Sequence, residues 1–162
     1  MSKYSETMRS TENKPTKLVV AGGSGFLGKV LRQELGRYFD EVVILTRKMR
    51  KAENPNERFV AWDARRVGPW TSVLEGADLL INLTGKSVNC RYNQANRDEI
   101  LESRVRSTLA LGAGVIAAED PPECWINASS ATIYTHSVDR PQTEAHGTIG
   151  NDFSMSVCRK WE

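Results

Sequence analysis

The sequence predicts an α/β fold, in which a doubly wound parallel sheet lies between two layers of helices. Short apolar runs typical of strands covered on both faces recur at 18–21, 41–46, 79–83 and 123–128. Segments with helical spacing separate these runs, as in right-handed βαβ units. At 162 residues and 40% hydrophobic content, the chain can bury a core but has little material for two domains. We therefore expect one domain of three layers.

A glycine-rich turn follows the first predicted strand directly and precedes a predicted helix that stops at Gly36. Its spacing is G-x-x-G-x-x-G. Such glycines permit a tight turn, bring the backbone close to a pyrophosphate and let the helix pack on the sheet, while the helix N-terminus favours anions. The alternative is a turn with no ligand, but the strand before it and the helix after it favour a Rossmann-type dinucleotide site. The predicted contacts here are Gly22, Gly25, Phe26, Leu27 and Gly28.

The end of the second predicted strand, 41–46, indicates which dinucleotide is bound. NAD-selective sites usually place a carboxylate about 20 residues past the glycines, whereas an arginine there suits a 2′-phosphate. Thr46 and Arg47 occupy this end, and Asp40 and Glu41 lie at the other. Charge complementarity therefore favours NADP over NAD, with a solvated basic loop as the alternative.

Two further strand ends are candidate parts of the same site. The third strand, 57–62, closes in Trp62 and Asp63, where an adenine ring could be flanked, although Trp62 is more simply a core residue. The fourth strand ends in Leu83, followed by Thr84 and Gly85. Because ligands in open α/β sheets bind at such ends, we expect Asp63, Leu83, Thr84 and Gly85 to contact the cofactor. A plain strand-to-loop turn is the alternative at 84–85.

The longest helix is predicted over 96–118, where apolar residues recur at intervals of three and four. The predicted buried stripe is Ile100, Leu101, Val105, Leu109, Gly112, Val115 and Ile116. Pro121 and Pro122 end the helix, and the fifth strand, 123–128, reads as a buried type.

Composition excludes several classes of protein. The chain has 22 basic and 20 acidic residues for a net charge of +2, so no nucleic-acid surface is indicated. Residues 1–16 are polar and are expected to be disordered, and neither a secretory signal nor a membrane span is evident, which favours the cytoplasm. The domain is expected over 17–162. Three widely spaced cysteines and two histidines predict no disulfide framework and no metal.

Four stretches in this order resemble the extended short-chain dehydrogenase/reductase superfamily: GGSGFLG, NLTG, ESRVRST and ASSATIY. The type is the NAD-dependent epimerase/dehydratase, and the nearest likeness is to its nucleoside-diphosphate-sugar epimerases. The resemblance runs from Leu18 to Glu162. It implies a small-molecule substrate such as a nucleotide sugar, a substrate-polarising hydroxyl, and a Tyr acid/base whose pKa a Lys lowers. Ser130 lies where this family has its catalytic Ser or Thr.

The family's Tyr-x-x-x-Lys pair is absent from this chain. Alignment on Glu162 places Ser154 at the Tyr position and Cys158 at the Lys position. A serine has no accessible pKa near neutrality, and a cysteine supplies no fixed positive charge. Lys160 comes two residues too late to share that helix face. Tyr134 remains as a candidate acid/base beside Ser130, although a tyrosine in that turn more often contacts substrate.

The chain is also shorter than the family pattern, which continues for a further half that builds most of the substrate pocket. We expect the fold to be truncated before this substrate region, leaving an edge strand for a second copy or another partner to cover. Three functions remain: an NAD(P)-dependent epimerase or oxidoreductase, a non-catalytic NADP-binding module or redox-responsive regulator, and a structural domain without a ligand.

Overall fold

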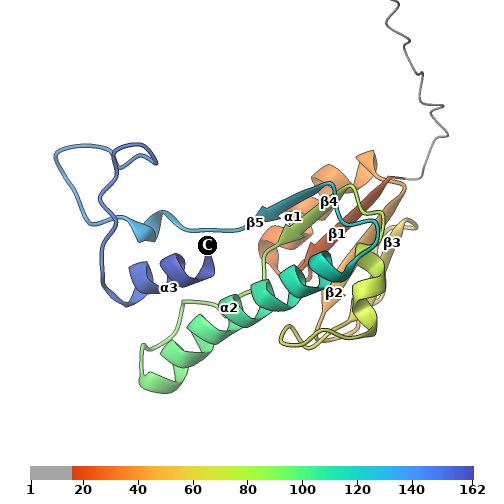
Figure 1. The fold of residues 1–162 in the computed structure, drawn as a ribbon, viewed down its shortest axis with the longest axis horizontal. Coiled ribbons are helices and arrows are strands. Elements are labelled where there is room, and N and C mark those ends of the chain that lie inside the picture. The colour runs from red at the N-terminus through yellow and green to blue at the C-terminus, as the bar shows by residue number, and fades with distance from the viewer. Residues whose placement is uncertain (1–15) are drawn as a thin grey trace, which may run out of the picture.

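The computed structural model describes residues 16–162, so the disorder expected over 1–16 concerns residues outside that range, Thr16 excepted. Five parallel strands form one sheet in the order β3-β2-β1-β4-β5 (Figure 1). The strands are β1 (Lys17–Ala21), β2 (Glu41–Thr46), β3 (Glu57–Ala61), β4 (Leu79–Asn82) and β5 (Cys124–Asn127). The helices are α1 (Phe26–Leu35), α2 (Gln94–Ala117) and α3 (Phe153–Trp161), with short 3-10 helices η1 (Gly36–Tyr38), η2 (Pro69–Leu74) and η3 (Ala131–Ile133).

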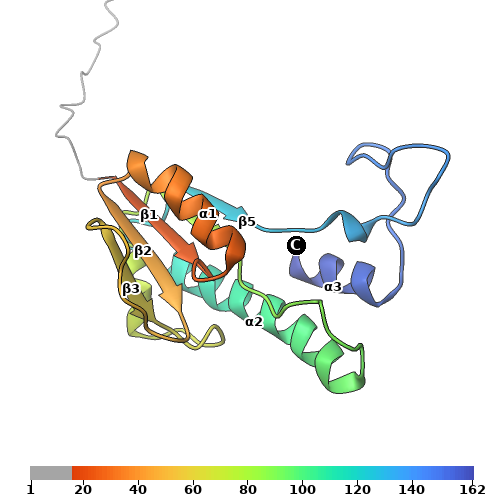
Figure 2. The same cartoon turned by 180° about the vertical axis from the view of Figure 1, so that it is seen from behind.

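Helices cover both faces of the sheet, which confirms the predicted Rossmann-type arrangement of three layers. In Figure 2, α1 lies in front of the sheet and α2 behind it. Successive strand residues point to opposite faces, so Val20 and Ile44 pack with α1. Val43 and Leu45 pack on the other side, with η2 and α2. The two cores explain why the strands read as continuous apolar runs.

The strand order places a crevice at one edge of the sheet. Successive connections run from β1 toward β2 on one side and toward β4 on the other, so the order reverses at β1. The carboxyl ends of parallel strands lie along one edge, and ligands of open α/β sheets bind where the order reverses. The turns after β1, β2 and β4 therefore share one edge.

The predicted buried stripe of α2 is partly wrong. Leu109 and Ile116 are 67% and 87% exposed, whereas Ser107, Ala110 and Gly114 are buried. A Cβ on Gly114 would lie 2.9 Å from Leu74 Cδ1, so small residues let α2 approach η2 closely. Close packing, rather than hydrophobic periodicity, decides which face is buried. Despite the length of α2, no helix within residues 16–162 combines the length and apolar character that a membrane span requires.

The expectation that the fifth strand is of the buried type is also wrong. Cys124 is exposed and Ile126 is 50% exposed. β5 pairs with β4 on one side, and in the described part of the chain no strand pairs with its other side. The apolar residues of β5 therefore belong to an edge strand, and the outer edge of this strand pairs with no other strand in the described part of the chain.

The C-terminal helix α3 lies beside the N-terminal half of α2 and against η3 (Figure 1). A long connection separates η3 from α3, and it is held by a bridge between Tyr134 and Ile149 and by hydrogen bonds that include Thr135 N to Thr148 O at 2.8 Å. Asp152 caps α3 by accepting a hydrogen bond from the N–H of Met155 at 2.9 Å. The Ser129 hydroxyl, just after β5, donates to the Glu162 carboxylate, so the end of β5 lies beside the C-terminal end of α3.

Candidate functional site

The three glycines of the turn after β1 have three different roles. Gly22 has φ of +75°, and a Cβ there would lie 3.0 Å from the carbonyl carbon of Leu83, at the end of β4. A Cβ on Gly28 would lie 2.4 Å from Gly23 Cα, so Gly28 lets α1 pack against the turn. A Cβ on Gly25 would meet only Gly22 O, at 3.5 Å. The space beside Gly25 is therefore open to a ligand.

The N-terminus of α1 offers unsatisfied hydrogen-bond donors. Gly25 occupies the cap position and no side chain caps the helix. The first intrahelical bond runs from Lys29 N to Gly25 O at 2.9 Å. The backbone N–H groups of Phe26, Leu27 and Gly28 therefore lack helical acceptors. Together with the helix dipole, they favour an anion at this point.

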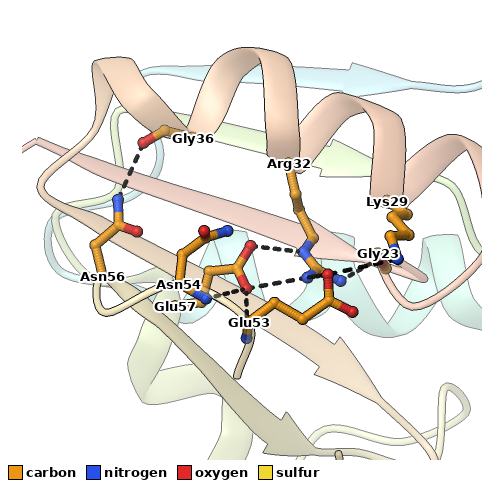
Figure 3. A network of polar contacts seen from close by, with 8 residues as sticks. All are labelled: Gly23, Lys29, Arg32, Gly36, Glu53, Asn54, Asn56 and Glu57. Carbon is orange, nitrogen blue, oxygen red and sulfur yellow. Dashed lines mark hydrogen bonds and ion pairs between the residues drawn. The ribbon is translucent and has the colours of Figure 1, made fainter. Parts of the chain in front are cut away.

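A buried arginine that the sequence analysis missed supports the turn (Figure 3). Arg32 donates from Nε and one terminal nitrogen to the two Glu57 oxygens, at 2.9 and 3.0 Å. Its other terminal nitrogen donates to Gly23 O at 3.2 Å. Burial raises the pKa of Glu57, but hydrogen bonds from Arg32 and Asn54 outweigh it and leave the pKa below its ordinary value. Arg32 thus ties the glycine turn to the start of β3.

Two adjoining cavities bring together most of the residues predicted to bind the cofactor. The first, of about 190 Å³, is lined by Gly22, Gly25, Thr46, Arg47, Leu83, Thr84 and Gly85, among others. The second, of about 210 Å³, shares Arg47, Thr84 and Gly85 and adds Asp63. Trp62 lines the first cavity but is 6% exposed and belongs to the core, as expected. Residues from four separate stretches thus meet at one edge of the sheet.

Among the described residues, two cations of the second cavity lie within 4.0 Å of a carboxylate and Arg47 does not. Lys86 forms an ion pair with Glu99, and Arg65 lies 4.0 Å from Glu102. The hydrogen bond from Lys86 lowers the pKa of Glu99, and the charges of Lys86, Arg47 and Arg65 lower it further. Arg47 has no ion-pair partner within residues 16–162, although it lines both cavities. Its guanidinium is the group best suited to bind a phosphate, by donating hydrogen bonds to the phosphate oxygens.

Two of the residues predicted to bind the cofactor, Asp63 and Thr46, form hydrogen bonds with the backbone of the turns in which they lie. The Asp63 carboxylate accepts from the backbone N–H groups of Arg65 and Arg66 at 2.8 and 2.9 Å, and these bonds lower its pKa. Thr46 is 4% exposed, and its hydroxyl donates to Lys48 O at 3.1 Å. Ala64, next to Asp63, lines both cavities. Its φ is +58°, which nothing in the sequence indicated. These residues shape the cavity walls.

Thr84 carries a polar atom without a partner. Its backbone N–H donates to Asn82 Oδ1 at 3.0 Å, and Asn82 also donates to Asn127 Oδ1 at 2.7 Å. Thr84 Oγ1 is buried and has no hydrogen-bond partner among the described residues. A buried hydroxyl is normally satisfied. With the open space at Gly25 and the free Arg47, it gives this edge the donors and room that a phosphorylated dinucleotide needs.

A larger cavity, of about 310 Å³, lies between the end of β4, α2, η3 and α3. Ser130, Ser154 and Cys158 all line it, as does Leu27 from α1. Ser130 Oγ lies 2.9 Å from Thr132 Oγ1, which lies 3.7 Å from Cys158 Sγ. The three positions that the resemblance relates to catalysis thus share one cavity.

Tyr134 lies elsewhere. It lines an open hollow together with Ser130, Gln142 and Gly147, and it does not line the cavity of Ser154 and Cys158. A Cβ on Gly147 would lie 2.4 Å from Tyr134 Cε1, so the ring packs on the long connection. Lys160 is exposed on α3, as its position in the helix predicted.

The thiols and histidines form no metal site in the described range. Cys90, Cys124 and Cys158 are free, and only Cys158 is buried. No group of three His, Cys, Asp or Glu side chains in residues 16–162 is placed to hold a metal ion.

Comparison with known proteins identifies relatives of this fold and site. Epimerase family protein YfhF of Bacillus subtilis is 32% identical over 145 residues, 90% of this chain and 48% of YfhF. The crystal structure of human epimerase family protein SDR39U1 with NADPH matches at a TM-score of 0.73 and 28% identity, covering 90% of this chain and 47% of that one. The nucleoside-diphosphate sugar epimerase of Corynebacterium glutamicum matches at 0.69 and 31%, covering 91% of this chain and 29% of that one.

These relatives share the extended short-chain dehydrogenase/reductase fold, which confirms the resemblance read from the four sequence stretches. The chain spans about half the length of the curated relatives it matches. The model of the NAD dependent epimerase/dehydratase family matches residues 18–152, most of the chain. The chain therefore belongs to the NAD dependent epimerase/dehydratase family.

Proposed function

We propose that the chain binds NADP(H) and forms the cofactor-binding half of an epimerase or oxidoreductase. One observation carries the proposal: the edge beside β1 and β4 combines open space at Gly25, the free donors of α1, an unpaired Arg47 and the unpartnered Thr84 Oγ1. The NADPH in the structure of human SDR39U1 supports it.

Each group would hold a different part of the cofactor. The first turn of α1, including Phe26, Leu27 and Gly28, would bind the pyrophosphate through backbone N–H groups. Arg47 would bind the 2′-phosphate. Thr84 and Gly85 would contact the ribose on the nicotinamide side. When bound, the cofactor supplies hydride transfer.

The catalytic part of the proposal rests on Ser130. Its hydroxyl would polarise a carbonyl or alcohol of the substrate, with Tyr134 as the remaining acid/base candidate. Ser154 and Cys158 face the same cavity as Ser130 but offer neither a tyrosine hydroxyl nor a lysine charge. We therefore expect this chain alone to turn over substrate very slowly.

A second function, a non-catalytic NADP-binding module or redox-responsive regulator, is favoured by the cavity that holds Ser130. No Lys, His, Asp or Glu is among its lining residues. Turnover by the parent chain distinguishes the two functions, because both require cofactor binding and only the first requires chemistry.

The substrate class follows from relatives and stays a proposal. A neighbour of 20% identity, MoeE5, was crystallised with UDP-glucuronic acid and NAD; at that identity it shows the fold alone. The named epimerase from Corynebacterium glutamicum makes nucleotide sugars the first substrates to test. The cytoplasm as location, and a second copy or other partner over the β5 edge, likewise remain predictions.

The test is titration with NADPH, followed by quenching of tryptophan fluorescence, for the parent and Gly25→Val. The valine would fill the space at Gly25 without a clash in the protein, so binding should weaken at least about tenfold while the circular-dichroism spectrum is kept. Gly36→Ala is the control, because a Cβ there makes an ordinary 3.5 Å contact with Val42 and Gly36 lines neither of the two cofactor cavities. Unchanged NADPH binding by a folded Gly25→Val variant would contradict the proposal.

A further inference from the structure

The cavity that holds Ser130 also contains a cation without a counter-charge. Arg104, on α2, lines this cavity and lies with its guanidinium 5.1 Å above the ring of Trp161. One terminal nitrogen donates to Lys86 O at 3.1 Å and to Ile100 O at 3.0 Å. Within residues 16–162 no carboxylate forms an ion pair with Arg104, and the cavity lining contains no Asp or Glu. The positive charge is therefore not neutralised by the described chain.

Burial makes this charge costly. Desolvation lowers the pKa of Arg104, and the neighbouring Cys158 and Tyr92 offset this only in part. An arginine nevertheless stays protonated in proteins. A partly buried cation without a counter-charge is costly even where carbonyl groups accept from it, and an anion beside it lowers that cost. The cavity thus favours a negatively charged group beside Arg104.

A second, independent observation points to the same ligand. Trp161 is 7% exposed and lines the cavity, and its indole N–H is buried with no acceptor among the described residues. A buried indole N–H normally finds a partner. Arg104 and Trp161 are both donors, so one acceptor with two oxygens would satisfy both. The remaining walls are largely apolar and include Leu83, Phe153 and Val157.

We propose that this cavity binds an organic carboxylate, with the carboxylate held by Arg104 and the Trp161 indole N–H and an apolar body packed against the remaining walls. That this ligand is the substrate rests on the proposed function. If it is, the substrate class is narrowed to organic acids. Binding of the acid itself depends only on the cavity. An inorganic anion carries the same negative charge as the carboxylate but has no apolar body. The test therefore includes inorganic phosphate.

The probe is phenylacetate, compared with phenylacetamide, its neutral analogue of the same shape, and with inorganic phosphate. Calorimetric titration of the full chain, with and without NADPH, should give measurable binding of phenylacetate and at least about tenfold weaker binding of phenylacetamide, because a hydrogen bond to a charged group contributes that much. Equal binding of acid and amide would overturn the inference, as would binding of phosphate in preference to phenylacetate.

Variants assign the binding to the two donors. Arg104→Gln should weaken phenylacetate binding roughly tenfold or more, whereas Arg104→Lys, which keeps the charge, should restore most of it. Trp161→Phe keeps an aromatic ring under Arg104 but removes the N–H, and should weaken binding several-fold. Arg106→Gln is the matched control, since Arg106 lies on the same helix but pairs with Glu102 outside the cavity.

The outcomes separate this inference from the proposed function. If NADPH fails to bind while phenylacetate binding still depends on Arg104, the cofactor proposal fails and the acid site stands. If NADPH binds and phenylacetate affinity is the same in the parent, Arg104→Gln and Trp161→Phe, the acid site fails alone. If Arg104→Gln does not fold, Trp161→Phe still tests the acid site, because it leaves the hydrogen bonds of Arg104 to the backbone in place. The deciding measurement is then the phenylacetate affinity of Trp161→Phe.

Discussion

Replacing Arg32 by Met removes one half of a buried ion pair and tests how the glycine turn is held. The side chains of Arg32 and Glu57 are 4% and 1% exposed. Breaking such a pair from one side costs about 3–5 kcal/mol, because the remaining charge stays buried without its partner. The backbone N–H groups of Glu53 and Asn54 still donate to Glu57, at 3.3 and 3.4 Å. We therefore expect the lower part of that range, about 3 kcal/mol.

The assay is urea denaturation followed by circular dichroism at pH 7, which gives the free energy of unfolding. Arg37→Met is the control, because Arg37 pairs with Glu34 at the surface, where both side chains are more than half exposed. Its loss should cost less than about 1 kcal/mol. The double variant Arg32→Met/Glu57→Leu should recover much of the stability, since it leaves no buried charge. A single Arg32→Met variant within about 1 kcal/mol of the parent would refute the reasoning.

Two further predictions concern acid stability and catalysis. The pKa of Glu57 is lowered in the folded chain, so its contribution is present above the ordinary glutamate pKa and is lost as the pH falls through the lowered value. Urea denaturation at a series of pH values should therefore show a smaller acid loss in Arg32→Met/Glu57→Leu than in the parent; equal losses would contradict this. The Ser154→Tyr/Cys158→Lys variant, incubated with NADP and a panel of nucleotide sugars, should reduce NADP roughly 10² to 10⁴ times faster than the parent, as a positioned acid/base does. Robust parent turnover that disappears in Tyr134→Phe would instead make Tyr134 the acid/base.

The sequence was sufficient to predict the sheet and to select candidate cofactor residues that the structure brings to one edge of it. Buried parallel strands have a strong apolar signal, and a glycine turn between a strand and a helix is specific in that setting. The residues at the ends of β1, β2 and β4 could be placed at one edge because parallel strands end together. Ser130 follows β5 and Ser154 and Cys158 lie on α3, and the fold brings all three to one cavity.

The sequence was insufficient where packing depends on contacts far apart in the chain. Ser107 and Gly114 are buried in α2 because small side chains let it approach η2, while Leu109 and Ile116 are exposed. Periodicity alone therefore predicted part of the buried face wrongly, although Ile100 is buried as predicted. Arg32 looked like one of several surface arginines, because its partner Glu57 lies 25 residues away. The role of Arg104 likewise depends on Trp161, in a helix that only the fold brings beside α2.

The selectivity between NADPH and NADH tests the central claim most directly, because it depends on the 2′-phosphate alone. We expect the parent to bind NADPH at least about tenfold more tightly than NADH, as one charge-assisted contact with Arg47 provides. Arg47→Ala should remove that preference with little change for NADH, while Lys48→Ala, a neighbouring cation outside both cavities, should keep it. Equal affinity of the parent for the two cofactors, or an unchanged preference in Arg47→Ala, would contradict the account.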